Sequence, residues 1–125
     1  MSAPAISRPI RTGIVGFGVS GRVFHAPLLN ANPEFVIDSI ATADRGRRAA
    51  ATEAYPEATI VESFADLVQR DLDLVVLGSP GHVHLEQGLA ALRSGAAVVV
   101  DKPFAPTAQE AEQLIAAAVQ AGRPI

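Results

Sequence analysis

The stretch TGIVGFGVSG, residues 12–21, decides how the rest of the chain is interpreted. A short apolar run ends at Gly16, and Gly18 and Gly21 follow at the spacing G-x-G-x-x-G. Where such a stretch joins a strand to a helix, the first glycine allows a tight turn, the second admits a pyrophosphate close to the backbone, and the third lets the helix pack near the strand. We therefore predict a dinucleotide phosphate loop; the alternative is a glycine-rich turn without a ligand. The predicted loop comprises Gly16, Phe17, Gly18, Val19, Ser20 and Gly21.

Four further apolar runs follow at residues 34–42, 59–61, 72–79 and 96–101. They are continuous rather than alternating, which is typical of a parallel sheet covered on both faces. Helical stretches lie between them, with capping residues at Asp44, Ser63 and Thr107. We predict an α/β fold, a doubly wound parallel sheet (Rossmann fold) of about five strands in the order 3-2-1-4-5, formed by residues 11–125 after a flexible arm at residues 1–10.

The helix after the glycine stretch contains Pro27, which removes a hydrogen bond and crowds the preceding turn. We predict a helical turn near residues 20–24, a break near His25 and Ala26, and a restart with Pro27 in the first turn.

Composition excludes several classes of function. The 125 residues are 49% hydrophobic and 18% charged with a net charge of −3, so no basic surface suggests nucleic acid and no membrane binding is indicated. Cysteine is absent, and His82 and His84 have no further ligand at metal-binding spacing, so no metal site is expected. No signal peptide is recognisable, so a cytoplasmic location is expected.

The end of the second strand bears on the choice of cofactor. Thr42 occupies the position where an acid would hold the ribose hydroxyls, and Asp44 lies late enough to serve as a helix cap. Arg45, Arg47 and Arg48 follow. A missing acid beside arginines favours a 2′-phosphate, hence NADP over NAD, with Thr42 and Arg45 as cofactor contacts; the alternative is that the arginines form only a solvated helix face.

Polar residues also follow the fourth and fifth strands, at the sheet edge where open α/β folds bind ligands. Ser79, Pro80 and His84 follow the fourth strand, and Asp101, Lys102 and Pro103 follow the fifth. The residue before a proline is held extended, so Lys102 is predicted to be a fixed cation that can hold a hydroxyl or carbonyl oxygen. The alternative is an Asp–Lys surface pair of little energetic weight.

Together these motifs resemble the N-terminal half of the Gfo/Idh/MocA family of oxidoreductases. The resemblance rests on GIVGFGVSGRVFHAPLL (13–29), YPEATIVESFADLV (55–68) and DLDLVVLGSPGHVHLEQGLAALRSGAAVVVDKPFAPTAQEAEQL (71–114), and runs from about Arg11 to Ile125. It implies that Ser79, Pro80, Gly81 and His84 match the family's threonine-proline-asparagine loop and its histidine. It also implies that Asp101, Lys102 and Pro103 match the glutamate-lysine-proline signature, whose lysine lies beside the nicotinamide and the reacting carbon. The shorter acid and Gly81 are departures from the family pattern.

The resemblance further implies a nicotinamide-dependent oxidoreductase acting on CH-OH groups of a sugar, polyol or related small molecule, with Lys102 as the catalytic residue. The family's second domain is missing from this chain, so we expect a truncated, inactive chain. The ribbon at residues 96–100 should then be a free sheet edge prone to self-association, and a homo-oligomer is expected. The alternative function is a non-catalytic dinucleotide-binding or sensor module, which would have no use for Lys102.

Overall fold

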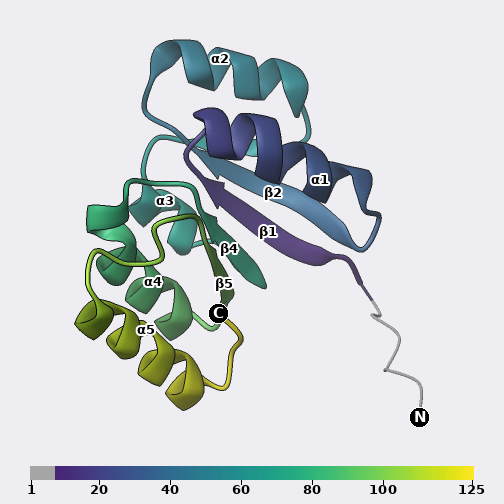
Figure 1. The fold of residues 1–125 in the computed structure, drawn as a ribbon. Coiled ribbons are helices and arrows are strands. Elements are labelled where there is room, and N and C mark those ends of the chain that lie inside the picture. The colour runs from purple at the N-terminus through teal and green to yellow at the C-terminus, as the bar shows by residue number, and fades with distance from the viewer. Residues whose placement is uncertain (1–7) are drawn as a thin grey trace.

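The computed structural model describes residues 8–125, which form a single parallel five-stranded sheet in the order β3-β2-β1-β4-β5 (Figure 1). The strands are β1 (Ile10–Val15), β2 (Phe35–Ala41), β3 (Thr59–Val61), β4 (Leu74–Leu77) and β5 (Ala97–Val100). The predicted fold class and strand order are confirmed. β1 lies between β2 and β4, so the connection after β1 leads to one side of the sheet and the strands β4 and β5 are added on the other side. Doubly wound sheets bind ligands at this switch point, beside the loop after β1.

Helices connect every strand to the next. They are η1 (Ser20–His25), α1 (Ala26–Ala31), α2 (Arg45–Ala54), α3 (Phe64–Val68), η2 (Gly81–Val83), α4 (His84–Arg93) and α5 (Ala108–Ala121). The side chains of Asp44, Ser63 and Thr107 each accept a backbone N–H from the residue three positions on, so the predicted caps of α2, α3 and α5 are confirmed. Gly122 ends α5 in the left-handed conformation with φ 66°.

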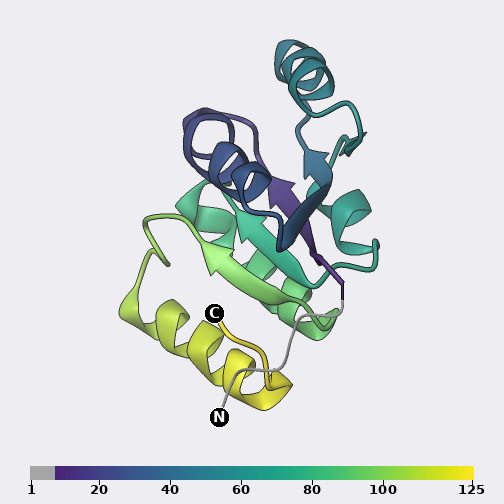
Figure 2. The same ribbon diagram turned by 90° about the vertical axis from the view of Figure 1, so that its right-hand side faces the viewer.

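The sheet buries a separate core on each face. Ile14 and Val76 pack with Ala26 and Ala51 under α1 and α2, whereas Val15, Val75 and Leu77 pack with residues of α3, α4 and α5. Figure 2 shows these helices on the two sides of the sheet. Neighbouring residues of one strand thus enter different cores, which explains why the strands are continuously apolar.

The segment around Pro27 is helical without a break. His25 and Ala26 keep right-handed helical angles of φ −70°, ψ −52° and φ −64°, ψ −46°, so the predicted break is wrong. Instead, η1 is a π-helix in which the N–H of Ala26 donates to the carbonyl of Gly21, five residues earlier. The wider π turn accommodates the proline ring without interrupting the helix.

A charged network holds the amino ends of the strands. Asp38 accepts hydrogen bonds from Arg11 (2.8 Å) and from Arg70 (2.7 Å), which ties β1, β2 and the segment after α3 together. Burial alone would raise the pKa of Asp38, but the hydrogen bonds from Arg70 and Arg11 outweigh it and lower the pKa from 3.8 to about 2.

The predicted arm at residues 1–10 falls mostly on residues 1–7, which lie outside the described residues. Arg8 pairs with both carboxylate oxygens of Asp73 at 2.7 and 2.9 Å, and Ile10 already belongs to β1. The ordered sheet therefore starts one residue before the predicted boundary.

The predicted edge strand is only partly open. β5 is the outermost strand of the described sheet, as predicted, but the N–H of Val98 donates to the carbonyl of Pro124 at 3.1 Å. The residues after α5 thus return alongside β5 and occupy one of its hydrogen-bonding groups. Val99 still leaves 41% of its surface exposed.

Candidate dinucleotide site

The glycine loop follows β1 directly, and its glycines serve different purposes. Gly16 has φ 93°, a conformation that side chains rarely adopt. A Cβ at Gly21 would lie 2.2 Å from the carbonyl oxygen of Gly16, so this glycine lets the helix pack onto the loop. A Cβ at Gly18 would come no closer than 3.9 Å to any other residue, the nearest being Arg47. Packing within the fold therefore does not require a glycine at position 18, whereas close approach of a phosphate would.

A groove of about 640 Å³ begins at this loop, and its volume is within the range of small-molecule sites. It reaches from β1 past the ends of β2 and β3 to the tip of β4. Five of the predicted site residues line it: Gly16, Gly18, Thr42, Ser79 and Pro80. It is also lined by Val15, Ala41, Ala43, Asp44, Arg47, Glu62, Phe64, Gly78 and Gln87.

Of the arginines after β2, Arg47 lines the groove and Arg45 does not. Arg45 is exposed in the first turn of α2, so its predicted role as a cofactor contact has no support from its position. The guanidinium of Arg47 lies beside Gly18 because helical side chains lean toward the N-terminus of their helix. Asp44 caps α2 by accepting the N–H of Arg47 at 2.9 Å, which commits this carboxylate to the helix.

His84 holds the tips of β4 and β5 together. Its ring is fully buried at 0% exposure, with Nδ1 2.8 Å from the carbonyl oxygen of Pro103 and Nε2 2.7 Å from that of Ser79. A Cβ at Gly81 would lie 2.8 Å from Cγ of Pro103, so the two tips are in direct contact. The sequence predicts His84 as a cofactor contact, whereas the structure places its buried ring against a carbonyl of each loop.

The tip of β5 presents Lys102 to solvent. The N–H of Asp101 donates to the carbonyl of Leu77 at 3.0 Å, which anchors the tip to β4. The Lys102–Pro103 peptide bond is cis, and Lys102 forms no salt bridge with any described residue. The carboxylate of Asp101 faces His25 of η1 rather than the groove.

Three other predicted loop residues do not line the groove with their side chains. Phe17 is 2% exposed and packs edge-to-face on Tyr55 with ring centroids 6.2 Å apart, so its side chain belongs to the core. Val19 is 71% exposed, and Ser20 begins η1. Their predicted roles as cofactor contacts therefore have no support from the lining of the groove.

Sequence reasoning missed Glu62 and Gln87, and it weighted Arg47 no more than its neighbours. Gln87 contacts the Ser79 hydroxyl through its Oε1 at 2.5 Å, one helical turn after His84. The signal for Arg47 was available, because a residue three positions after an N-cap lies over the cap and faces the preceding loop. Nothing in the sequence around Glu62 singles it out.

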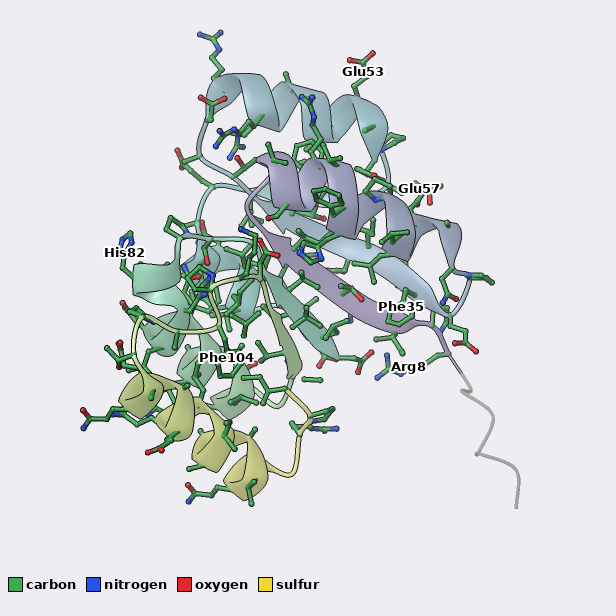
Figure 3. The ribbon with its side chains drawn as sticks, viewed as in Figure 1. Arg8, Phe35, Glu53, Glu57, His82 and Phe104 are labelled. Atoms are coloured by element: carbon green, nitrogen blue, oxygen red, sulfur yellow. The ribbon has the colours of Figure 1, made fainter. Side chains whose placement is uncertain are left out.

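Figure 3 shows His82 at the margin of the molecule, and its side chain is exposed. Among residues 8–125 no group of acidic residues and histidines could hold a metal ion. In the same described part of the chain, no helix combines the length and apolar character needed to cross a membrane.

Residues 10–125 match the model of a family described as an oxidoreductase family with an NAD-binding Rossmann fold. Scyllo-inositol 2-dehydrogenase (NADP(+)) IolW of Bacillus subtilis is 35% identical over 114 residues, covering 90% of this chain and 31% of that protein. Inositol 2-dehydrogenase 1 of Saccharopolyspora erythraea is 34% identical over 116 residues, covering 91% of this chain and 34% of that protein.

The solved structure of KijD10, a 3-ketoreductase from Actinomadura kijaniata in complex with NADP and TDP-benzene, superimposes with a TM-score of 0.86. Its sequence identity is 32%, and the match covers 93% of this chain and 36% of that chain. The chain thus spans about a third of the length of the relatives it matches.

Proposed function

The chain belongs to the Gfo/Idh/MocA family of oxidoreductases, and we propose that it binds NADP as the cofactor domain of an enzyme that transfers hydride to or from a sugar-like substrate. The proposal rests on the groove that joins Gly18, the neighbouring Arg47 guanidinium and the Ser79–Pro80 tip. A glycine loop supplies close backbone approach to a pyrophosphate, and the ends of β2 and β4 receive the two halves of a dinucleotide. The described residues therefore fit a dinucleotide.

The preference for NADP rests on Arg47. No acidic side chain occupies the end of β2, where Thr42 is buried, and Asp44 is already a helix cap. An arginine in the groove can pair with the extra phosphate of NADP, and the guanidinium geometry suits a phosphate. Glu62 is a second carboxylate on the groove wall and would oppose this preference. IolW and KijD10 are both described with NADP, which agrees with it.

Lys102 is the proposed catalytic residue. When bound, the nicotinamide supplies the acceptor or donor of hydride. Lys102 would hold the substrate oxygen and stabilise the charge that develops on it, because its ammonium is exposed at the sheet edge without an ionic partner among the described residues. His84 fixes the loop that carries the lysine through the carbonyl of Pro103.

The substrate is proposed to be a sugar, polyol or related compound, because the named relatives act on inositols or are described as a ketoreductase. A cytoplasmic location, self-association and the lack of a nucleic-acid partner stay predictions. The rival function, a non-catalytic dinucleotide-binding module, accounts for the groove but leaves Lys102 without a purpose.

The test compares cofactor affinities of two matched variants. Arg47→Gln should weaken NADP binding by about tenfold, equal to about 1.4 kcal/mol, and leave NAD binding nearly unchanged. Arg45→Gln, two residues before Arg47 and outside the groove, should change neither dissociation constant. Calorimetry at low salt measures both. Tighter binding of NAD than NADP by the wild-type chain would contradict the NADP assignment, and equal effects of the two variants would contradict the role of Arg47.

A further inference from the structure

The acid beside the chain's single lysine faces a histidine from a distant part of the sequence. Nε2 of His25 lies 3.5 Å from Oδ1 of Asp101. Nε2 is buried and has no hydrogen-bond partner, and Asp101 is the only carboxylate within 4.0 Å of it among residues 8–125. The separation slightly exceeds that of a well-formed N–H···O hydrogen bond. The two groups therefore lie within ion-pair distance of each other, and a closer approach would be needed for a hydrogen bond.

Both partners are anchored by their backbones. On the helix side, the N–H of Arg22 donates to the carbonyl of Gly18, and the N–H of Ala26 donates to that of Gly21. On the strand side, the N–H of Asp101 donates to the carbonyl of Leu77. His25 thus reaches from the helix of the glycine loop to the residue that precedes Lys102.

The contact differs from an ordinary surface ion pair. The side chains of His25 and Asp101 are 22% and 32% exposed, and the histidine nitrogen itself is buried. Lys102, by contrast, is exposed and forms no salt bridge with a described residue. Asp101 is the carboxylate nearest to Lys102 in sequence and therefore its most obvious ionic partner. While Asp101 faces His25, the Lys102 ammonium is left without this partner.

We propose that His25 is a positioning residue that holds the Asp101 carboxylate against η1 and keeps it from pairing with Lys102. The ammonium is then available to the reacting oxygen of the substrate. The inference deepens the proposed function and rests on it, since a free lysine at this edge matters only if Lys102 acts on a substrate. A carboxylate released from His25 would instead compete for the lysine as a surface ion pair.

The single lysine allows a direct test on the chain itself. The rate at which an amine-directed acylating reagent modifies Lys102 is followed by mass spectrometry, which separates this site from the N-terminal amine. His25→Ala should slow modification about two- to threefold, because the freed carboxylate pairs with the ammonium. His25→Gln, which keeps an N–H donor, should restore the wild-type rate, and His25→Phe replaces the alanine variant if that variant does not fold.

A double-mutant cycle assigns the effect to Asp101. Asp101→Asn in the His25→Ala background should return the rate to that of the wild type, and the exposed control His82→Ala should leave it unchanged. A wild-type rate in folded His25→Ala, or an equal slowing with Asn at position 101, would overturn the inference. NADP binding by the wild-type chain is measured separately; its absence would refute the proposed function while the cycle still decides the contact between His25 and Asp101.

Discussion

Gly18 and Gly21 belong to the same motif, yet the structure predicts opposite consequences for replacing them. The Cβ of an alanine at Gly18 would stay at least 3.9 Å from other residues, and the φ of this glycine is not positive. Gly18→Ala should therefore change the free energy of unfolding by no more than about 0.5 kcal/mol. Gly18→Val should also fold, but its branched side chain would occupy the space that a pyrophosphate needs. We expect the NADP dissociation constant to rise at least about tenfold, equal to about 1.4 kcal/mol.

Gly21→Ala should instead damage the fold. Its Cβ would lie 2.2 Å from the carbonyl oxygen of Gly16, a backbone atom that cannot turn aside. Overpacking of this kind costs about 1–3 kcal/mol, and we expect the upper part of that range. Urea unfolding and calorimetry with NADP measure the two effects. Unchanged NADP affinity in folded Gly18→Val, or wild-type stability in Gly21→Ala, would refute the claim that Gly18 serves ligand binding and Gly21 serves packing.

Three further predictions concern the fold and Lys102, the proposed catalytic residue. Asp38 has its pKa lowered from 3.8 to about 2 in the fold, so its contribution of about 2 kcal/mol is present above pH 3.8 and is lost as the pH falls through about 2. The stability difference between wild type and Asp38→Asn, measured in urea, should accordingly shrink between pH 7 and pH 3; a constant difference would contradict the pairing with Arg11 and Arg70. His84→Ala should lower the free energy of unfolding by about 3 kcal/mol, because it removes a fully buried ring and its contacts with two carbonyls. The control His82→Ala, at an exposed position, should change the free energy of unfolding by less than about 0.5 kcal/mol. Similar values for the two variants would contradict the role of His84 in holding the two loops together. In the proposed enzyme, Lys102→Met should reduce turnover about 100-fold and leave the protein folded, and a fully active variant would favour a binding module without catalysis.

The fold was predictable because several local signals agreed with one another. Continuous apolar runs, three helix caps and the glycine spacing all pointed to the same alternation of strands and helices, and the strand order followed. The helix at Pro27 was not predictable, because a proline reads as a break unless a π turn makes room for its ring.

The sequence predicted the loops that form the candidate site better than it predicted the side chains that line the groove. Sequence identified the strand tips that carry Ser79 and Lys102, but it could not show which side chains turn inward. His84 and Phe17 stand in motif positions yet are buried for packing and loop bracing, whereas Arg47 emerges only when the start of α2 is placed beside the glycine loop. The contact between His25 and Asp101 joins residues far apart in the chain, and no spacing rule connects them.

The most direct test of the account is a fluorescence titration of NADPH with the wild-type chain, which contains no tryptophan to interfere with the signal. We expect saturable binding that NADP displaces more effectively than NAD and that Gly18→Val weakens at least about tenfold. A folded wild-type chain that binds neither dinucleotide at concentrations of about 1 mM would contradict the claim that this groove is a dinucleotide site.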